Sequence, residues 1–163
     1  MCAGDEEHVL RIYGEGIATG HATFEGTVPS WEAWDRGHLE ACRLVASHDG
    51  SVIGWAALSA TSQRPVYRGV AELSIYISAL ARGRGVGDAL LATLITSSEA
   101  EGIWSLQAGV FPENAASLRL HERHGFRRVG VRERIGKMPF GPMAGQWRDV
   151  VVLQRRSACV GID

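Results

Sequence analysis

The segment Val70-Ala-Glu-Leu-Ser-Ile-Tyr-Ile-Ser-Ala-Leu-Ala-Arg-Gly-Arg-Gly-Val-Gly-Asp-Ala-Leu-Leu91 carries the strongest structural signal in this sequence. Its first half alternates apolar and polar residues, which is the period of a strand with one buried face. Its second half has helical spacing, and three glycines and two arginines lie between the halves. The first turn of a helix offers free backbone N–H groups and a dipole that favours an anion. The segment therefore predicts a strand, a phosphate-binding turn and a helix in direct succession.

Two familiar phosphate-binding loops do not match this turn. Nucleotide hydrolases need Gly-Lys-Ser/Thr, but Gly87 is followed by Asp88 and Ala89. A dinucleotide fingerprint that begins at Gly83 requires glycine where Asp88 stands. The pattern that remains is Arg82-x-x-Gly85-x-Gly87. A glycine-rich turn that merely joins the strand to the helix is the alternative.

Composition indicates one ordinary globular domain. The chain has 163 residues, of which 45% are hydrophobic and 21% charged, and its net charge of −1 gives no basic excess for nucleic acid. Its three distant cysteines show no Cys-x-x-Cys spacing, and no apolar run approaches the roughly 20 residues that span a bilayer. We therefore expect a single domain over residues 1–163 with a loose tail at 155–163. We expect no metal, no nucleic-acid or membrane partner, and a cytoplasmic location.

The rest of the chain alternates between helix-like and strand-like patterns. Periodicity and capping predict helices at 6–16, 31–38, 86–101 and 112–124, and strands at 42–47, 52–59, 70–77, 104–111, 126–135 and 146–154. The Asp49-Gly50 pair predicts a hairpin turn. Residues 19–27 are expected to form a loop beside a cleft. This order predicts an α/β or α+β fold built on one sheet.

Three motifs resemble a known enzyme family. Arg82-x-x-Gly85-x-Gly87 resembles the pyrophosphate-binding motif of the GNAT acetyltransferase superfamily. Residues 111–126 and 145–150 resemble the Asn-x-x-Ser-x-x-Leu-His-Glu-x-x-Gly-Phe and Gly-x-Trp-x-Asp-Val segments of its phosphinothricin acetyltransferase branch. The similarity covers nearly all of the chain. It implies a central mixed, mostly antiparallel sheet that is splayed between its central strands, with helices on both faces, and it implies a homodimer.

The sequence departs from the family pattern in two respects. Only about eight residues precede the first helical apolar position, Val9, so the strand that normally opens the fold is expected to be short or missing. Ala144 and Glu25 stand where some members carry histidine and arginine. These differences leave the acetyl acceptor open.

The resemblance implies acetyl-CoA as co-substrate and assigns residues to it. Backbone N–H groups near residues 75–77 would bind the pantetheine arm and the thioester oxygen, and the turn after them would wrap the pyrophosphate. One face of the helix at 112–124 would lie beside the cofactor. The cofactor-binding candidates are Ile75, Tyr76, Ile77, Arg82, Gly83, Arg84, Gly85, Val86, Gly87, Asp88, Asn114 and Ser117.

Two residues are candidates for proton transfer. Glu72 lies on the polar face of the central strand, where partial desolvation would raise the pKa of its carboxyl and suit it as a general base acting through water. A structural pair with Arg64 or Arg68 is the alternative. His121 shares a helix face with Asn114 and is the candidate acid for the leaving thiolate, although a structural role is also open.

The acceptor pocket is predicted from the same resemblance. Arg64 is the first choice for binding an acceptor carboxylate, with Tyr67, Phe24 and Trp34 as walls, and ordinary solvation or core packing are the alternatives. The leading hypothesis is an N-acetyltransferase for a small glutamate-like amino-acid analogue of the phosphinothricin, methionine sulfoximine or arsinothricin type, with resistance as the outcome. The alternatives are a GNAT enzyme for another amine or a peptide N-terminus, or a non-catalytic acyl-CoA-binding sensor.

Overall fold

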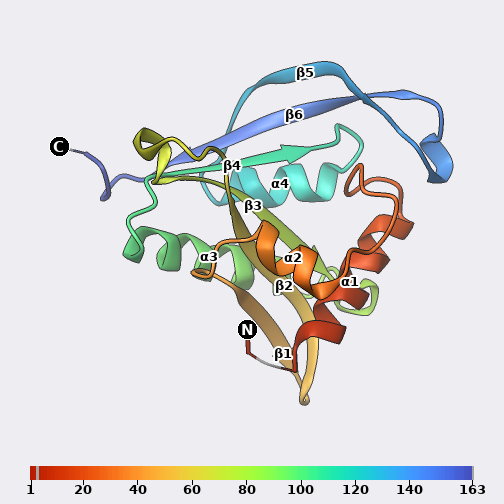
Figure 1. The fold of residues 1–163 in the computed structure, drawn as a ribbon, viewed down its shortest axis with the longest axis horizontal. Coiled ribbons are helices and arrows are strands. Elements are labelled where there is room, and N and C mark those ends of the chain that lie inside the picture. Colours follow the sequence, from red (N-terminus) through yellow and green to blue (C-terminus); the bar gives the residue numbers. More distant parts are fainter. Residues whose placement is uncertain (3, 163) are drawn as a thin grey trace.

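A single six-stranded sheet forms the centre of the molecule (Figure 1). The computed structural model describes residues 1–2 and 4–162. The strands follow the order β1-β2-β3-β4-β6-β5, and every neighbouring pair is antiparallel except β3 and β4. Their bounds are β1 Leu44–His48, β2 Ser51–Ala60, β3 Val70–Ile77, β4 Ser105–Val110, β5 Arg127–Lys137 and β6 Trp147–Arg156. The predicted mixed, mostly antiparallel sheet is confirmed.

Four α-helices cover the two faces of this sheet. They are α1 Glu6–Ala18, α2 Trp31–Gly37, α3 Val86–Ala100 and α4 Ala115–Arg123. Side chains alternate along β2, so Ala56 and Leu58 pack in the cluster with α3, whereas Trp55 and Ala57 pack in the cluster with α1 and α2. Each face of the central strands is therefore buried under its own helices. Strands β5 and β6 form a long hairpin along one side of the molecule (Figure 1).

Most elements lie close to their predicted positions, and the first helix shows why one boundary differs. The prediction ended this helix at Gly16, but α1 continues to Ala18. A Cβ at Gly16 would lie 2.6 Å from the Tyr76 ring, so glycine lets α1 pack closely on β3. Within residues 1–2 and 4–162 no strand precedes α1, and β1 is an edge strand of the sheet.

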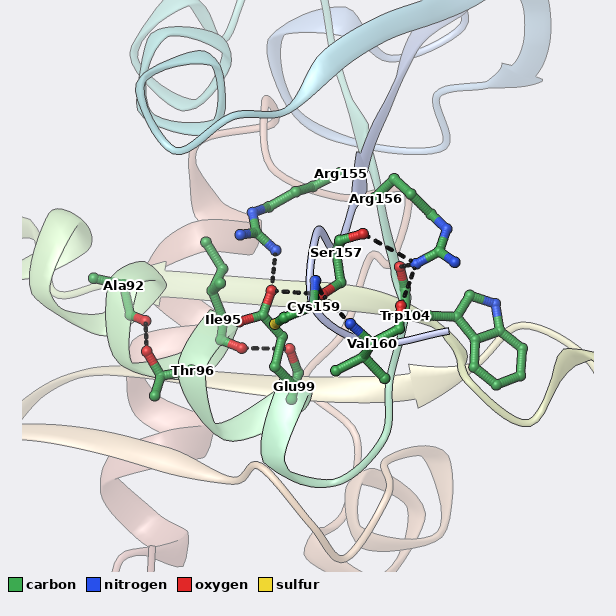
Figure 2. Close-up of polar contacts among 11 residues, drawn as sticks. Ala92, Ile95, Thr96, Glu99, Trp104, Arg155, Arg156, Ser157, Cys159 and Val160 are labelled. Carbon is green, nitrogen blue, oxygen red and sulfur yellow. Dashed lines mark hydrogen bonds and ion pairs between the residues drawn. The ribbon is translucent and has the colours of Figure 1, made fainter. Parts of the chain in front are cut away.

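The end of the chain corrects the prediction of a loose tail. Strand β6 continues to Arg156, and the residues after it fold back against α3 and β4 (Figure 2). Glu99 of α3 accepts hydrogen bonds from Arg155 and from the Ser157 hydroxyl, each at 2.9 Å. Arg156 donates to the Trp104 carbonyl at 2.8 Å. The contacts of the tail extend to Gly161, whose carbonyl accepts a hydrogen bond from Arg156, and Asp163 lies outside the described residues.

No helix in the described part of the chain combines the length and the apolar character needed to cross a membrane.

Candidate active site

The two central strands separate partway along their length. Pairing between β3 and β4 covers only three positions and ends at Glu72 with Gln107. Beyond this point β3 continues to Ile77 and β4 to Val110 without pairing to each other. The split opens a cavity of about 520 Å³, lined by both strands, by residues 21–25 after α1, by α4 and by the β5–β6 hairpin. Backbone groups of β3 that face the split are free of a strand partner on that side.

Glu72 lies at the last paired position, on the wall of this cavity. Gly109 lies across the split, where a Cβ would be 4.0 Å from the Glu72 Oε1 atom. Among the described residues the Glu72 carboxylate forms no ion pair, so the alternative pairing with Arg64 or Arg68 is not found. The carboxylate is available to a bound molecule and to water.

The helix α4 presents a polar face to the cavity. Asn114 caps this helix, because its Oδ1 accepts the Ser117 N–H at 3.2 Å, and its Nδ2 donates to the His21 carbonyl at 3.3 Å. His121 follows on the same face and is 2% exposed. Asn114, Ser117 and His121 all line the cavity, so the structure brings together these three residues of the predicted helix face.

The hydrogen bonds of His121 define its protonation. Its Nδ1 lies 2.7 Å from the Ser117 carbonyl oxygen, which can only accept, so Nδ1 carries a proton. Burial holds the pKa of the imidazole below its usual value, although the bond to Ser117 opposes the shift. The neutral ring then has its lone pair on Nε2, which is buried and has no partner among the described atoms. In this state His121 accepts a proton or a hydrogen bond, which is opposite to the predicted acid role.

The turn after β3 has the form of an anion-binding site. Gly83 and Gly85 have φ angles of +73° and +79°, and a Cβ at either position would meet nothing within 4 Å. The first helical bond of α3 runs from the Ala89 N–H to the Gly85 carbonyl at 3.1 Å. In the described chain the N–H groups of residues 83–88 donate no hydrogen bond, so they remain free for an anion.

Asp88 is a predicted cofactor-binding residue, and its side chain contacts α4. Its carboxylate accepts bonds from Arg123 at 2.9 and 3.0 Å and lies 3.2 Å from His124 Nε2. The bonds from Arg123 hold the pKa of Asp88 below its usual value. The side chain therefore ties α3 to α4, and only its backbone N–H faces the turn.

The predicted acceptor residues do not share one cavity. Phe24 lines the cavity beside Glu72 and packs edge-on against Phe111 with ring centroids 4.9 Å apart. Trp34 is 2% exposed and stacks between Trp31 and His38 in the core, so its prediction as a pocket wall is corrected.

Arg64 and Tyr67 line a second hollow of about 570 Å³ with Trp104 and Arg156. Only Gln107 borders both hollows among the lining residues. The loop before β3 thus places the Arg64 guanidinium over the Tyr67 ring, at 5.7 Å, away from the cavity that holds Glu72.

Sequence reasoning missed several residues of the cavity wall. Arg132 of β5 lines the cavity, and the other formally charged lining residues are the carboxylates Glu25 and Glu72. Tyr13 was not predicted either, and it packs edge-on there against the predicted residue Tyr76. Burial raises the pKa of the Tyr76 phenol, so its hydroxyl stays neutral. The arginine-rich composition of residues 127–134 was visible in the sequence, but which of these side chains faces the cavity depends on two register shifts in the pairing of β5 with β6.

Comparison with known proteins agrees with this architecture. The family model described as Acetyltransferase (GNAT) family matches residues 13–126. The chain is 37% identical to a phosphinothricin N-acetyltransferase of Alcaligenes faecalis, over 90% of this chain and 75% of the relative. It is 31% identical to an L-methionine sulfoximine/L-methionine sulfone acetyltransferase of Pseudomonas paraeruginosa, over 90% and 86% of the two chains.

A solved structure shares the whole fold. The phosphinothricin acetyltransferase of Sinorhizobium meliloti in complex with AcCoA superposes with a TM-score of 0.86 at 32% identity, covering 100% of this chain and 89% of that one. The split sheet, the free N–H groups of the turn and these similarities lead to one assignment. This chain belongs to the GNAT acetyltransferase family, in its phosphinothricin acetyltransferase-like branch.

Proposed function

We propose that this protein transfers an acetyl group from acetyl-CoA to the amino group of a small glutamate-like amino-acid analogue. Compounds of the phosphinothricin, methionine sulfoximine or arsinothricin type are the proposed acceptors, and resistance to them is the proposed outcome. The proposal rests on the cavity at the β3–β4 split. There the Glu72 carboxylate, which forms no ion pair among the described residues, lies beside the part of β3 that has no β4 partner. The names of the Alcaligenes and Pseudomonas relatives support the acceptor class.

Acetyl-CoA would lie along β3, with one end at the turn after this strand and the other at the split. The N–H groups of residues 83–88 would bind its pyrophosphate. Backbone groups of residues 75–77 that face the split, where β3 has no β4 partner, would bind its pantetheine arm. When bound, acetyl-CoA supplies an activated acetyl thioester. The Sinorhizobium relative, whose structure contains AcCoA, has the same fold.

The proposed chemistry is direct attack by the acceptor amine. Glu72 takes one proton of the acceptor ammonium, directly or through water, and the neutral amine forms the new C–N bond as the C–S bond breaks. The second proton leaves the nitrogen for His121 or water and ends on the departing thiolate or in solvent. Free N–H groups of β3 stabilise the charge that develops on the thioester oxygen. A thiol has a pKa of about 8.5, so the thiolate leaves with little assistance. The Nε2 atom of His121 has a free lone pair, so in this proposal it accepts the second proton of the attacking amine. It does not begin the reaction by donating a proton to the thiolate.

Acceptor recognition is assigned to the charged residues that line the cavity. Arg132 would bind the acceptor carboxylate through its planar fork, while Glu25 and Glu72 favour the amino end. Phe24 and Phe111 form the apolar wall between them. In this proposal Arg132 replaces Arg64, which lies in the second hollow.

Two measurements, made one after the other, test the proposed function. Acetyl-CoA at about 100 times its dissociation constant should stabilise the fold by about 2.7 kcal/mol, which is a rise of roughly 5–10 °C in Tm for a chain of this size. Gly85→Val should lose much of this shift, because a β-branched residue disfavours the left-handed conformation at φ +79°. Thiol release should then be measured across amino-acid analogues, simple amines and peptide N-termini.

Each outcome of this panel separates the proposal from its alternatives. We expect the highest kcat/KM for acceptors that combine an α-amino acid with a second anionic or polar head. A preference for peptide N-termini would replace the proposed acceptor class. A full thermal shift without turnover of any amine would identify an acyl-CoA-binding sensor instead, and the absence of a thermal shift would contradict the phosphate-binding turn.

We further propose that residues 1–163 form one cytoplasmic domain that assembles as a homodimer through the β5–β6 hairpin. Val129, Val131 and Trp147 are exposed on this hairpin, Val131 to 54%. Ile135, also exposed, lines the cavity, so the interface would lie beside the site. Sedimentation should give twice the 17.6 kDa chain mass. Val131→Asp should yield monomers, whereas the control Val66→Asp, exposed outside the hairpin, should not. A monomeric wild type would contradict the proposal.

A further inference from the structure

An arginine is buried at one end of the cavity, in a strand where its charge is unexpected. Arg148 lies in β6, and its side chain is only 1% exposed. Alternation along the strand places it on the same face as Val150 and Val152, which line the cavity. Burying a charge is costly unless it is paired and hydrogen-bonded. The contacts of the Arg148 side chain therefore indicate which interactions offset the cost of burying its charge.

The guanidinium joins three segments that are far apart in the sequence. Its Nη1 donates to the Gly20 carbonyl at 3.1 Å, and its Nη2 donates to Glu113 Oε2 at 2.9 Å. Nη2 also lies 3.3 Å from His21 Nδ1. The guanidinium carbon lies 4.0 Å from the centroid of the Phe111 ring, so the planar group stacks on this wall of the cavity.

These partners lead directly to the acceptor side of the cavity. Gly20 and His21 begin the loop after α1, and the next residues, 22–25, line the cavity. Within that loop Phe24 packs against Phe111, the same ring that Arg148 stacks on. The same loop also accepts a hydrogen bond at the His21 carbonyl from Asn114. Removing Arg148 would free Gly20 and His21 from their contacts with the guanidinium and would leave Phe111 without the cation stacked on it.

The buried Arg148 guanidinium is incompletely satisfied, which indicates that its main role is not to stabilise the fold. The Nε atom of Arg148 is buried and has no hydrogen-bond partner among the described atoms. Its ionic partner Glu113 is 46% exposed, so the pair is incompletely shielded from water. An imperfectly satisfied buried ion pair adds little to stability and is often replaceable by apolar side chains. A rigid planar fork does, however, set the relative positions of the groups that it binds.

We infer that Arg148 is a positioning residue, which holds the loop at 20–25 and the Phe111 ring in the arrangement that binds the acceptor. This inference rests on the proposed acetyl transfer, because it assigns the acceptor side of the same cavity. Arg148 itself is covered by the loop and does not touch the acceptor. Its effect should be confined to the acceptor, since the turn at 82–87 and the β3 backbone lie on other elements.

The test compares two arginine substitutions in the same strand. Arg148→Met keeps the length and apolar stem but removes the fork, and Arg155→Met removes a similar ion pair, to Glu99, that lies away from the cavity. Arg148→Met should raise the acceptor KM roughly tenfold or more, because small misplacements of a binding wall cost large factors. The KM for acetyl-CoA should stay within about twofold of wild type, and Arg155→Met should leave both constants unchanged.

Two milder variants keep the inference testable if Arg148→Met does not fold. Arg148→Lys retains the charge without the fork and should restore only part of the acceptor affinity. Glu113→Gln retains an acceptor oxygen on a half-exposed side chain and should produce a smaller rise in the acceptor KM. Equal increases in both KM values, or the same acceptor effect in Arg155→Met, would overturn the inference.

Hydrogen–deuterium exchange separates this inference from the proposed function. Amides of residues 20–25 should exchange faster in Arg148→Met, or in Arg148→Lys, than in Arg155→Met, while amides of α3 should not differ between them. If the wild-type protein acetylates no acceptor, the proposed function fails. The exchange rates of residues 20–25 in the Arg148 and Arg155 variants then test the positioning role of Arg148 without an activity assay. Faster exchange confined to 20–25 supports the anchor, and equal exchange in the variants contradicts it.

Discussion

Glu72→Gln should lower kcat/KM for the best acceptor by about 10²–10⁴-fold, the usual contribution of a positioned general base. The amide has nearly the same size but cannot take a proton from the acceptor ammonium. Glu72 lies where β3 and β4 stop pairing, and it forms no ion pair among the described residues, so the substitution breaks no structural contact of this kind. Thermal stability and the acetyl-CoA-induced rise in Tm should therefore remain close to wild type.

Glu25→Gln is the matched control, because Glu25 is the other carboxylate that lines the cavity. It should alter the acceptor KM more than kcat, since it lies on the loop rather than at the split. The deficit of Glu72→Gln should shrink as the pH rises toward the pKa of the acceptor amine, because the neutral amine then forms without a base. An unchanged kcat/KM, or a deficit that does not depend on pH, would contradict the assignment of Glu72 as base.

Trp34→Ala should destabilise the fold by about 3–5 kcal/mol, as expected when a buried aromatic side chain is removed from a core. For a chain of this size the loss corresponds to a fall of roughly 6–20 °C in Tm. Trp34 stacks on Trp31 and His38 and meets Trp55 edge-on with centroids 5.4 Å apart. The cavity left by the indole cannot be filled by these rigid neighbours.

Urea unfolding of Trp34→Ala and Trp31→Ala measures this difference on one helix. Trp31 is less buried and should cost clearly less stability. At temperatures where Trp34→Ala remains folded, its acceptor KM should match wild type. A variant of near-normal stability with a raised acceptor KM would restore Trp34 as a pocket wall and would contradict its place in the core.

Trp34 and Arg64 show where the sequence prediction of the site failed. Trp31 and Trp34 are three residues apart, so helical periodicity predicts that they share an apolar face, and the structure agrees. The same periodicity cannot say whether that face covers the sheet or borders a cavity. Likewise Arg64-x-x-Tyr67 is recognisable as a motif, but the path of the loop before β3 decides which hollow it enters.

Arg148 shows a different limit. An arginine within a strand-like run is ordinarily read as solvent-exposed, because such a charge is seldom fully buried. Here it is buried by Gly20, 128 residues earlier in the chain. The order of residue types within β6 does not predict that contact.

The order of helices and strands, the glycine-rich turn after β3 and the family could all be predicted from the sequence. These features depend on side-chain periodicity, capping and backbone conformations within a few neighbouring residues, which are local properties of the chain. Only the tertiary structure decided four features of the site. They are the cavity, the separation of Arg64 from Glu72, the tautomer of His121 and the burial of Arg148. They depend on distant segments meeting where β3 and β4 part, and the free energy of those contacts exists only once the chain has folded.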